Sequence, residues 1–141
     1  LKNTEFTNIL RSSGLRPTKQ RLKICEVLFN RDHTFHFTIN DLAKNISEEL
    51  NERISLATVY NTVHAFKKKG YLKEISINSD KSYFDTNTTN HHHFFDEDTN
   101  ELIDCDDGII ETPKIKKNIS GKKINSVEVL VKVATDNQNQ K

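Results

Sequence analysis

The stretch "SLATVYNTVHAFKKKGYLKEISI", residues 55–77, carries the strongest structural signals in the chain. Ser55 is a good N-cap, and apolar residues at helical spacing follow it, so the pattern predicts a helix over Leu56–Lys69. Gly70 is typical of the residue that ends a helix, and the three lysines before it favour the last turn. A strand is expected next, over Tyr71–Ile77. The stretch therefore predicts a helix that leads directly into a small sheet.

Three further helices are expected before this stretch. Thr4 is a candidate cap for a helix over Glu5–Arg11. Pro17 fits the first turn of a second helix, whose apolar face runs to about residue 29. Thr38 is a good N-cap for a helix over Ile39–Leu50, in which apolar residues recur at helical spacing.

A second strand is expected over Lys81–Thr86, after a turn at residues 78–80. Three helices followed by a two-stranded hairpin are the pattern of a winged helix-turn-helix domain, although any small α+β domain has similar elements. We therefore expect an α+β fold with a winged-helix DNA-binding domain over residues 1–86.

The pattern changes after residue 90. The segments 91–95 and 101–105 predict short strands, 111–123 is polar and rich in turn residues, and Ile124–Val133 alternates like a strand. A small sheet with few partners in its own chain tends to pair with a second copy. We therefore expect a small C-terminal α/β domain for metal binding and dimerisation over residues 87–134, and a disordered tail over 135–141.

Charge divides along the chain in the same way. Residues 1–90 carry 14 Lys and Arg against 10 Asp and Glu, whereas residues 91–141 carry 7 against 10, which together give the net charge of +1. This asymmetry indicates a basic part and an acidic part with different tasks. The two cysteines, Cys25 and Cys105, exclude a disulfide framework and favour the cytoplasm. No apolar run approaches the roughly 18 residues of a membrane span.

The helix over Leu56–Lys69 is the candidate recognition helix. Residues on it and at its cap that offer contacts to bases are Ser55, Thr58, Tyr60, Asn61 and His64. Basic residues available for phosphates are Arg16, Lys19, Arg21, Lys67, Lys68 and Lys81. For individual lysines, a solvated surface remains the alternative.

Histidines and carboxylates form the candidate metal site. His91 and His93 are two residues apart, so a strand places both on one face and His92 on the other. Asp85 at the end of the wing, Asp104 on the following strand and His36 before the third helix complete a set that suits Fe²⁺, Mn²⁺ or Zn²⁺. The set is His36, Asp85, His91, His93 and Asp104. Because it joins both parts of the chain, an ion held there would fix their relative orientation. A merely solvated histidine run is the alternative.

The segments "GLRPTKQRLKICEVLF", "HFTINDLAKNI", "LATVYNTVHAFKKKGYLKEI", "KSYFD" and "HHHFF" resemble the ferric uptake regulator family over roughly residues 5–133. The resemblance implies a homodimeric, metal-responsive repressor that binds double-stranded DNA at a palindromic, AT-rich operator. It also implies the same five metal ligands, base reading by Tyr60 and its neighbours, and minor-groove contact by Arg16. Asn61 stands where many relatives have arginine.

Two departures from the family pattern stand out. Asp96 and Thr99 occupy the positions of a cysteine pair, so we expect no structural Cys₄ zinc site. The resemblance implies a second metal site of which His92 and Glu111 remain, while its late histidine position is Val127. We expect this second site to be depleted.

The histidine triplet and the missing cysteines resemble the iron response regulator (Irr) branch of the family, which implies control of iron and haem homeostasis. Haem would then bind through His91, His92 and His93, since imidazole is a competent axial ligand. A peroxide-sensing regulator, which also has Asp at position 104, is the alternative within the family. A mononuclear metal-dependent enzyme and a metal-storage protein are the alternatives from other classes; we expect a regulator rather than an enzyme.

Overall fold

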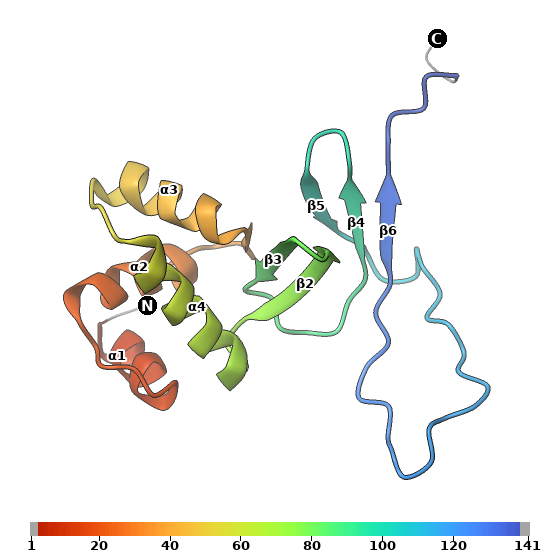
Figure 1. Cartoon of the computed structure of the whole chain (residues 1–141), viewed down its shortest axis with the longest axis horizontal. Helices are drawn as coiled ribbons and strands as arrows, with labels where there is room; N and C mark the ends of the chain where they lie inside the picture. The colour runs from red at the N-terminus through yellow and green to blue at the C-terminus, as the bar shows by residue number, and fades with distance from the viewer. Residues whose placement is uncertain (1–2, 139–141) are drawn as a thin grey trace. The chain divides into compact units, whose positions relative to one another are not determined.

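The computed structural model describes residues 3–138 and consists of two compact units, which divide between Thr88 and Thr89 (Figure 1). The sequence placed the boundary at residues 86 and 87. Each unit is described by itself below. No helix among residues 3–138 has both the length and the apolar character that crossing a membrane requires.

Four helices make up most of the first unit. They are α1 (Asn3–Ser12), α2 (Lys19–Phe29), α3 (Ile39–Leu50) and α4 (Leu56–Lys69). The predicted bounds of α3 and α4 are confirmed, because both ends of α4 and the start of α3 depend on local capping. Thr38 and Asp41 form a reciprocal capping box at the start of α3, and Gly70 ends α4 with a φ of 95°.

The predicted starts of the first two helices are wrong. Thr4 lies inside α1 instead of capping it. α2 begins at Lys19, and Pro17 lies before its first turn. The cap is Thr18, whose hydroxyl accepts a hydrogen bond from the Arg21 N–H at 3.3 Å. A threonine hydroxyl satisfies one of the free N–H groups of a helix, which proline at N1 cannot do.

Three antiparallel strands complete the first unit in the order β1-β3-β2. They are β1 (His36–Phe37), β2 (Lys73–Asn78) and β3 (Lys81–Asp85), so β2 and β3 form the predicted wing. No strand was predicted at His36, but β1 pairs with β3 and sets His36 opposite Asp85. This short strand brings two predicted metal ligands together.

One apolar core holds this unit. It includes Leu10, Ile24, Leu28, Phe37, Leu42, Ile46, Val59, Val63, Phe66 and Phe84. The rings of Phe37 and Phe84 lie stacked with centroids 5.7 Å apart. Because these two residues directly follow His36 and precede Asp85, the core fixes the backbone that carries both side chains.

The second unit contains a three-stranded sheet in the order β5-β4-β6. Its strands are β4 (His93–Asp96), β5 (Glu101–Asp104) and β6 (Leu130–Val133). β4 and β5 form an antiparallel hairpin, whereas β6 runs parallel to β4. The strand predicted for 91–95 therefore begins two residues late, and only the last four residues of Ile124–Val133 are in a strand.

A long connection without helix or strand joins β5 to β6 over residues 105–129. It contains the predicted polar, turn-rich segment. The unit has no helix within residues 89–138, so the helix that an α/β domain implies is absent from its described part. Of the predicted tail, residues 139–141 lie outside the described residues, and Thr135 donates its N–H to the Asp98 carboxylate.

Candidate metal centre

In the first unit, His36 and Asp85 form a close pair. The Nε2 atom of His36 lies 3.0 Å from Oδ2 of Asp85, as the pairing of β1 with β3 dictates. The Asp85 side chain is fully buried, and its other oxygen accepts the Asn87 N–H at 2.8 Å. A buried carboxylate needs such partners, and the backbone N–H turns Oδ2 toward the imidazole.

In the second unit, His91, His93 and Asp104 converge on one point. Nε2 of His91 lies 2.9 Å and Nε2 of His93 lies 3.1 Å from the same oxygen, Oδ1 of Asp104. The antiparallel register of β4 and β5 sets His93 opposite Asp104. Two imidazoles and one carboxylate are a donor set able to hold a metal ion.

The tautomer of His91 indicates that a cation lies between His91 and Asp104. Nδ1 of His91 lies 2.7 Å from the Thr89 carbonyl oxygen. A carbonyl oxygen only accepts hydrogen bonds, so Nδ1 carries the proton of the neutral ring. The lone pair of Nε2 then faces the Asp104 carboxylate, which also only accepts. Two facing acceptors need a cation between them, either a proton or a metal ion. Sequence reasoning missed the role of Thr89 because it is played by a backbone atom.

The spacing of these donors fits a metal ion. Two ligand atoms about 2.1 Å from one ion are about 3.0 Å apart if they meet it at a right angle, and about 3.4 Å apart in a tetrahedron. The nitrogen–oxygen distances are 3.0 Å in the His36–Asp85 pair and 2.9 and 3.1 Å in the trio. These distances are also those of ordinary hydrogen bonds, so they place the donors close enough to share an ion without selecting its coordination geometry.

His92 turns away from the trio, as the predicted alternation requires. Its Nδ1 accepts the Val129 N–H at 2.8 Å, so Nε2 carries the proton and donates to Oγ1 of Thr112 at 3.2 Å. Neither ring nitrogen is open in this arrangement. Glu111 is exposed, and no cluster of three or more donors among residues 3–138 includes it or His92. The depletion of the second metal site implied by the resemblance stays a prediction.

The cysteines do not form a metal site within the described residues. Cys25 and Cys105 are both free and buried, one in each unit. Burial raises the pKa of the Cys25 thiol to about 12, which disfavours the thiolate that metals bind. Asp96 and Thr99 stand at the positions of the cysteine pair that the family resemblance implies. Oδ1 of Asp96 accepts a hydrogen bond from the Thr99 N–H at 3.2 Å, which stabilises the turn between β4 and β5.

The candidate base-reading residues share the start of α4. Ser55 caps the helix and accepts the Thr58 N–H, so both hydroxyls take part in the cap. Tyr60 is 52% exposed, and the centroid of its ring lies 4.1 Å from the centroid of the His64 ring. Asn61 is exposed beside it.

The candidate phosphate-contacting residues are more dispersed. Arg16 and Lys19 are exposed, and Arg21 donates to the carbonyl oxygen of Arg16 at 3.0 Å. The Lys81 ammonium lies 5.3 Å from the centre of the Tyr83 ring. Lys67 is less available, because it pairs with Glu74 at 2.7 Å.

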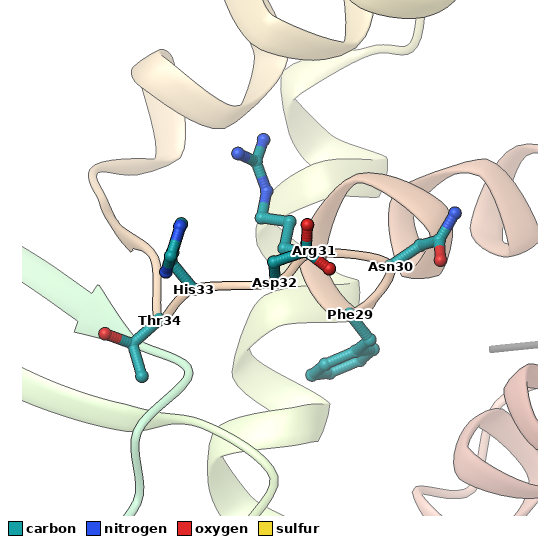
Figure 2. A pocket seen from close by; sticks show the side chains of 6 residues that line it. All are labelled: Phe29, Asn30, Arg31, Asp32, His33 and Thr34. Atoms are coloured by element: carbon teal, nitrogen blue, oxygen red, sulfur yellow. The ribbon is translucent and has the colours of Figure 1, made fainter.

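A hollow of about 460 Å³ lies in the loop between α2 and β1, lined by residues 29–34 (Figure 2). Figure 2 shows that these side chains fan out and do not converge on a common point. Arg31 in this loop is bound to Glu49 at 3.1 Å and lies over the Phe35 ring. The hollow therefore offers no constellation comparable to the metal centre.

Comparison with known proteins gives a consistent result. A peroxide-responsive repressor (PerR) of Staphylococcus aureus strain Mu50 is 37% identical over 95 residues, which cover 67% of this chain and 62% of that protein. The chain thus spans less than two thirds of the length of the curated relatives it matches.

Two solved structures match nearly the whole chain. The ferric uptake regulator of Pseudomonas aeruginosa with manganese is 25% identical, with a TM-score of 0.67 and coverage of 92% of this chain and 97% of that one. The ferric uptake regulator of Vibrio cholerae is 24% identical, with a TM-score of 0.70 and coverage of 92% and 98%. The model described as "Ferric uptake regulator family" matches residues 12–133. The chain therefore belongs to the ferric uptake regulator family.

Proposed function

We propose that the protein is a metal-responsive, DNA-binding transcriptional regulator, and that one ion joins the His36–Asp85 pair to the trio of His91, His93 and Asp104. The carrying observation is that Nε2 of His91 and Nε2 of His93 both lie within 3.1 Å of one Asp104 oxygen, a set of donors able to hold a metal ion. Only residues 86–90 separate Asp85 from His91, so this connection spans at most about 20 Å. A connection of this length allows both donor groups to bind one ion.

A bound ion would supply positive charge that neutralises the carboxylates and holds both units in one arrangement. DNA binding responds to the ion only if the DNA-competent arrangement binds the ion more tightly than the alternatives do. The winged-helix form of the first unit supports DNA as the partner. α4 exposes Tyr60 and Asn61 at its N-terminal half, the part of a recognition helix that contacts base edges.

We also propose a homodimer formed through the second unit. Apolar side chains are exposed on or next to its strands, namely Ile103 on β5, Ile109 after it and Val133 on β6, with exposures of 40, 61 and 37%. β5 and β6 are both edge strands of a sheet with only three strands. Exposed apolar groups beside open strand edges are typical of a surface that a second copy covers.

The proposed function can be refined in two respects: which metal binds and which signal the protein senses. The imidazole and carboxylate donors suit Fe²⁺, Mn²⁺ or Zn²⁺. A peroxide-responsive repressor is favoured by the Staphylococcus aureus relatives, which carry that name. The iron- and haem-responsive reading rests on His91, His92 and His93. All three imidazoles have hydrogen-bond partners inside the unit, so haem ligation would have to break those bonds.

The deciding experiment is a DNA-binding titration at fixed salt on a palindromic, AT-rich operator. It compares apo protein, Mn²⁺, Fe²⁺, Fe²⁺ followed by peroxide, and haem. His93→Ala removes a ligand of the trio, and His33→Ala is the matched control, because His33 is an exposed histidine outside the site. We expect Mn²⁺ to strengthen binding in the wild type and in His33→Ala but not in His93→Ala.

Each further outcome selects one reading. Loss of binding after peroxide with Fe²⁺ but not with Mn²⁺ supports the peroxide-responsive reading. Loss on adding haem supports the haem-responsive one. DNA binding that is equal with and without every ligand would contradict a regulator controlled through this site. A metal-dependent enzyme would then be the competing reading, although the hollow beside His91, at about 160 Å³, is below the roughly 300 Å³ of common ligand pockets.

A further inference from the structure

The connection between β5 and β6 carries a concentrated positive charge. Residues 113–127, hereafter the lysine loop, contain five lysines and no Asp or Glu, while residues 89–112 contain eight Asp and Glu and no Lys or Arg. The lysines are Lys114, Lys116, Lys117, Lys122 and Lys123, and all are exposed. The acidic net charge of the second unit therefore conceals a strongly basic loop.

The charge of the lysine loop is not neutralised within the described chain. None of its five lysines forms an ion pair with another residue among 3–138. Carboxylates of the same unit have other partners: Asp96 accepts backbone N–H groups, Asp98 accepts the Thr135 N–H, and Asp104 meets the histidines. Five like charges within ten residues repel one another, and a multivalent anion outside the chain would relieve that repulsion.

The lysine loop is held at both ends and in its middle. His92 binds Thr112 at 3.2 Å and Val129 at 2.8 Å, the residues just outside the two ends of the loop region. At the tip, the Asn118 side-chain amide donates to the Lys122 carbonyl oxygen at 2.8 Å. The turn also uses Gly121, whose φ of 76° favours glycine. These contacts restrain the ends and the tip of the loop, which reduces the conformational entropy that the loop loses when it binds a partner.

We propose that the lysine loop is a second DNA-contacting surface, which binds the sugar-phosphate backbone of duplex DNA independently of base sequence. The proposal shares with the proposed function only the assumption that DNA is the partner. Duplex DNA carries one charge per roughly 1.7 Å, which suits closely spaced ammonium groups. The loop contains no aromatic residue for stacking on unpaired bases, which argues against single strands.

The test is the salt dependence of binding to a random-sequence duplex by the metal-free protein. One variant carries Lys114→Gln, Lys116→Gln, Lys117→Gln, Lys122→Gln and Lys123→Gln. The matched control replaces the same five lysines with arginine, which keeps the charge. The binding constant K falls as salt rises, and each lost phosphate contact makes the slope of log K against log salt concentration less steep by about 0.9. Losing three contacts makes the slope about 2.7 less steep. Between about 50 and 200 mM salt, the binding constant of the variant then falls by a factor roughly 40 times smaller than that of the wild type.

We expect this reduction in the glutamine variant and not in the arginine control. Selective protection of the loop lysines from acetylation by the duplex, with exposed Lys44 as the internal reference, would support the same conclusion. Equal slopes in wild type and glutamine variant would overturn the proposal, and so would a wild type that binds no duplex. If the glutamine variant changed the dissociation of the dimer but not DNA binding, the proposal would be overturned, and the acidic segment of a second copy would be the partner of the loop. This assay uses neither metal nor operator. Its result can therefore be interpreted even if the metal does not control DNA binding as proposed.

Discussion

Replacing Asp104 with asparagine is the sharpest test of the metal centre. Asp104→Asn keeps the shape of the side chain but removes the charge of the oxygen that lies 2.9 Å from His91 and 3.1 Å from His93. A neutral amide is a much weaker metal ligand than a carboxylate. The change removes the charged donor from the trio and leaves both histidines in place.

The size of the effect follows from the surroundings of Asp104. Removing a partner that only orients a metal ligand typically costs 10- to 100-fold in metal affinity. A direct ligand should reach the upper end of that range, about 100-fold or roughly 2.7 kcal/mol. The Asp104 side chain is 36% exposed, so water replaces part of the lost coordination and the loss remains measurable.

Calorimetric titration with Mn²⁺ at neutral pH measures this loss. Asp106→Asn is the matched control, since it removes the same charge from an exposed carboxylate two residues away. Circular dichroism checks that both variants are folded. If Asp104→Asn binds Mn²⁺ within about threefold of the wild type, or if Asp106→Asn loses as much, the assignment of the trio is refuted.

Three further predictions concern the first unit. Thr38→Ala removes the capping box of α3 and should lower the free energy of unfolding by about 1 kcal/mol in urea titrations, whereas Thr38→Ser should restore most of it. The Lys67 ammonium holds the pKa of Glu74 below its usual 4.5, so this pair stabilises the fold above that pH and ceases to do so as pH falls through the lower, folded value. Glu74→Gln should therefore cost under about 1 kcal/mol at pH 7 and nothing near pH 2, and an equal cost at both would contradict the pairing. Because burial raises the pKa of Cys25 to about 12, iodoacetamide should not label it in the folded protein at pH 8; rapid labelling detected by mass spectrometry would show that the site opens.

The sequence predicted best the elements whose signals are local. α3 and α4 were predicted residue for residue because Thr38, Ser55 and Gly70 act within one helical turn of the bounds they set. β1 was missed because a strand of two residues, His36–Phe37, has no periodicity to detect. Its existence depends on β3, which lies more than forty residues later in the chain.

The same distinction applies to the candidate site. The five ligands were chosen for their chemistry and for the alternation of His91 and His93; in the structure both side chains contact the same Asp104 oxygen, although His91 lies before β4, while His92 bonds elsewhere. The sequence could not show what His92 binds, because its partners Thr112 and Val129 are 20 and 37 residues away. Contacts of that range depend on how an irregular connection folds, which no short pattern encodes.

The parallel pairing of β4 with β6 has a consequence for the order in which the second unit assembles. His91, His93 and Asp104 all lie in or beside the β4–β5 hairpin, whose pairing is local. β6 pairs His93 with Leu130, and closing a loop of that length costs on the order of 3 kcal/mol in chain entropy. Local hairpins form faster than such long-range contacts. We therefore expect the trio to assemble before β6 joins the sheet.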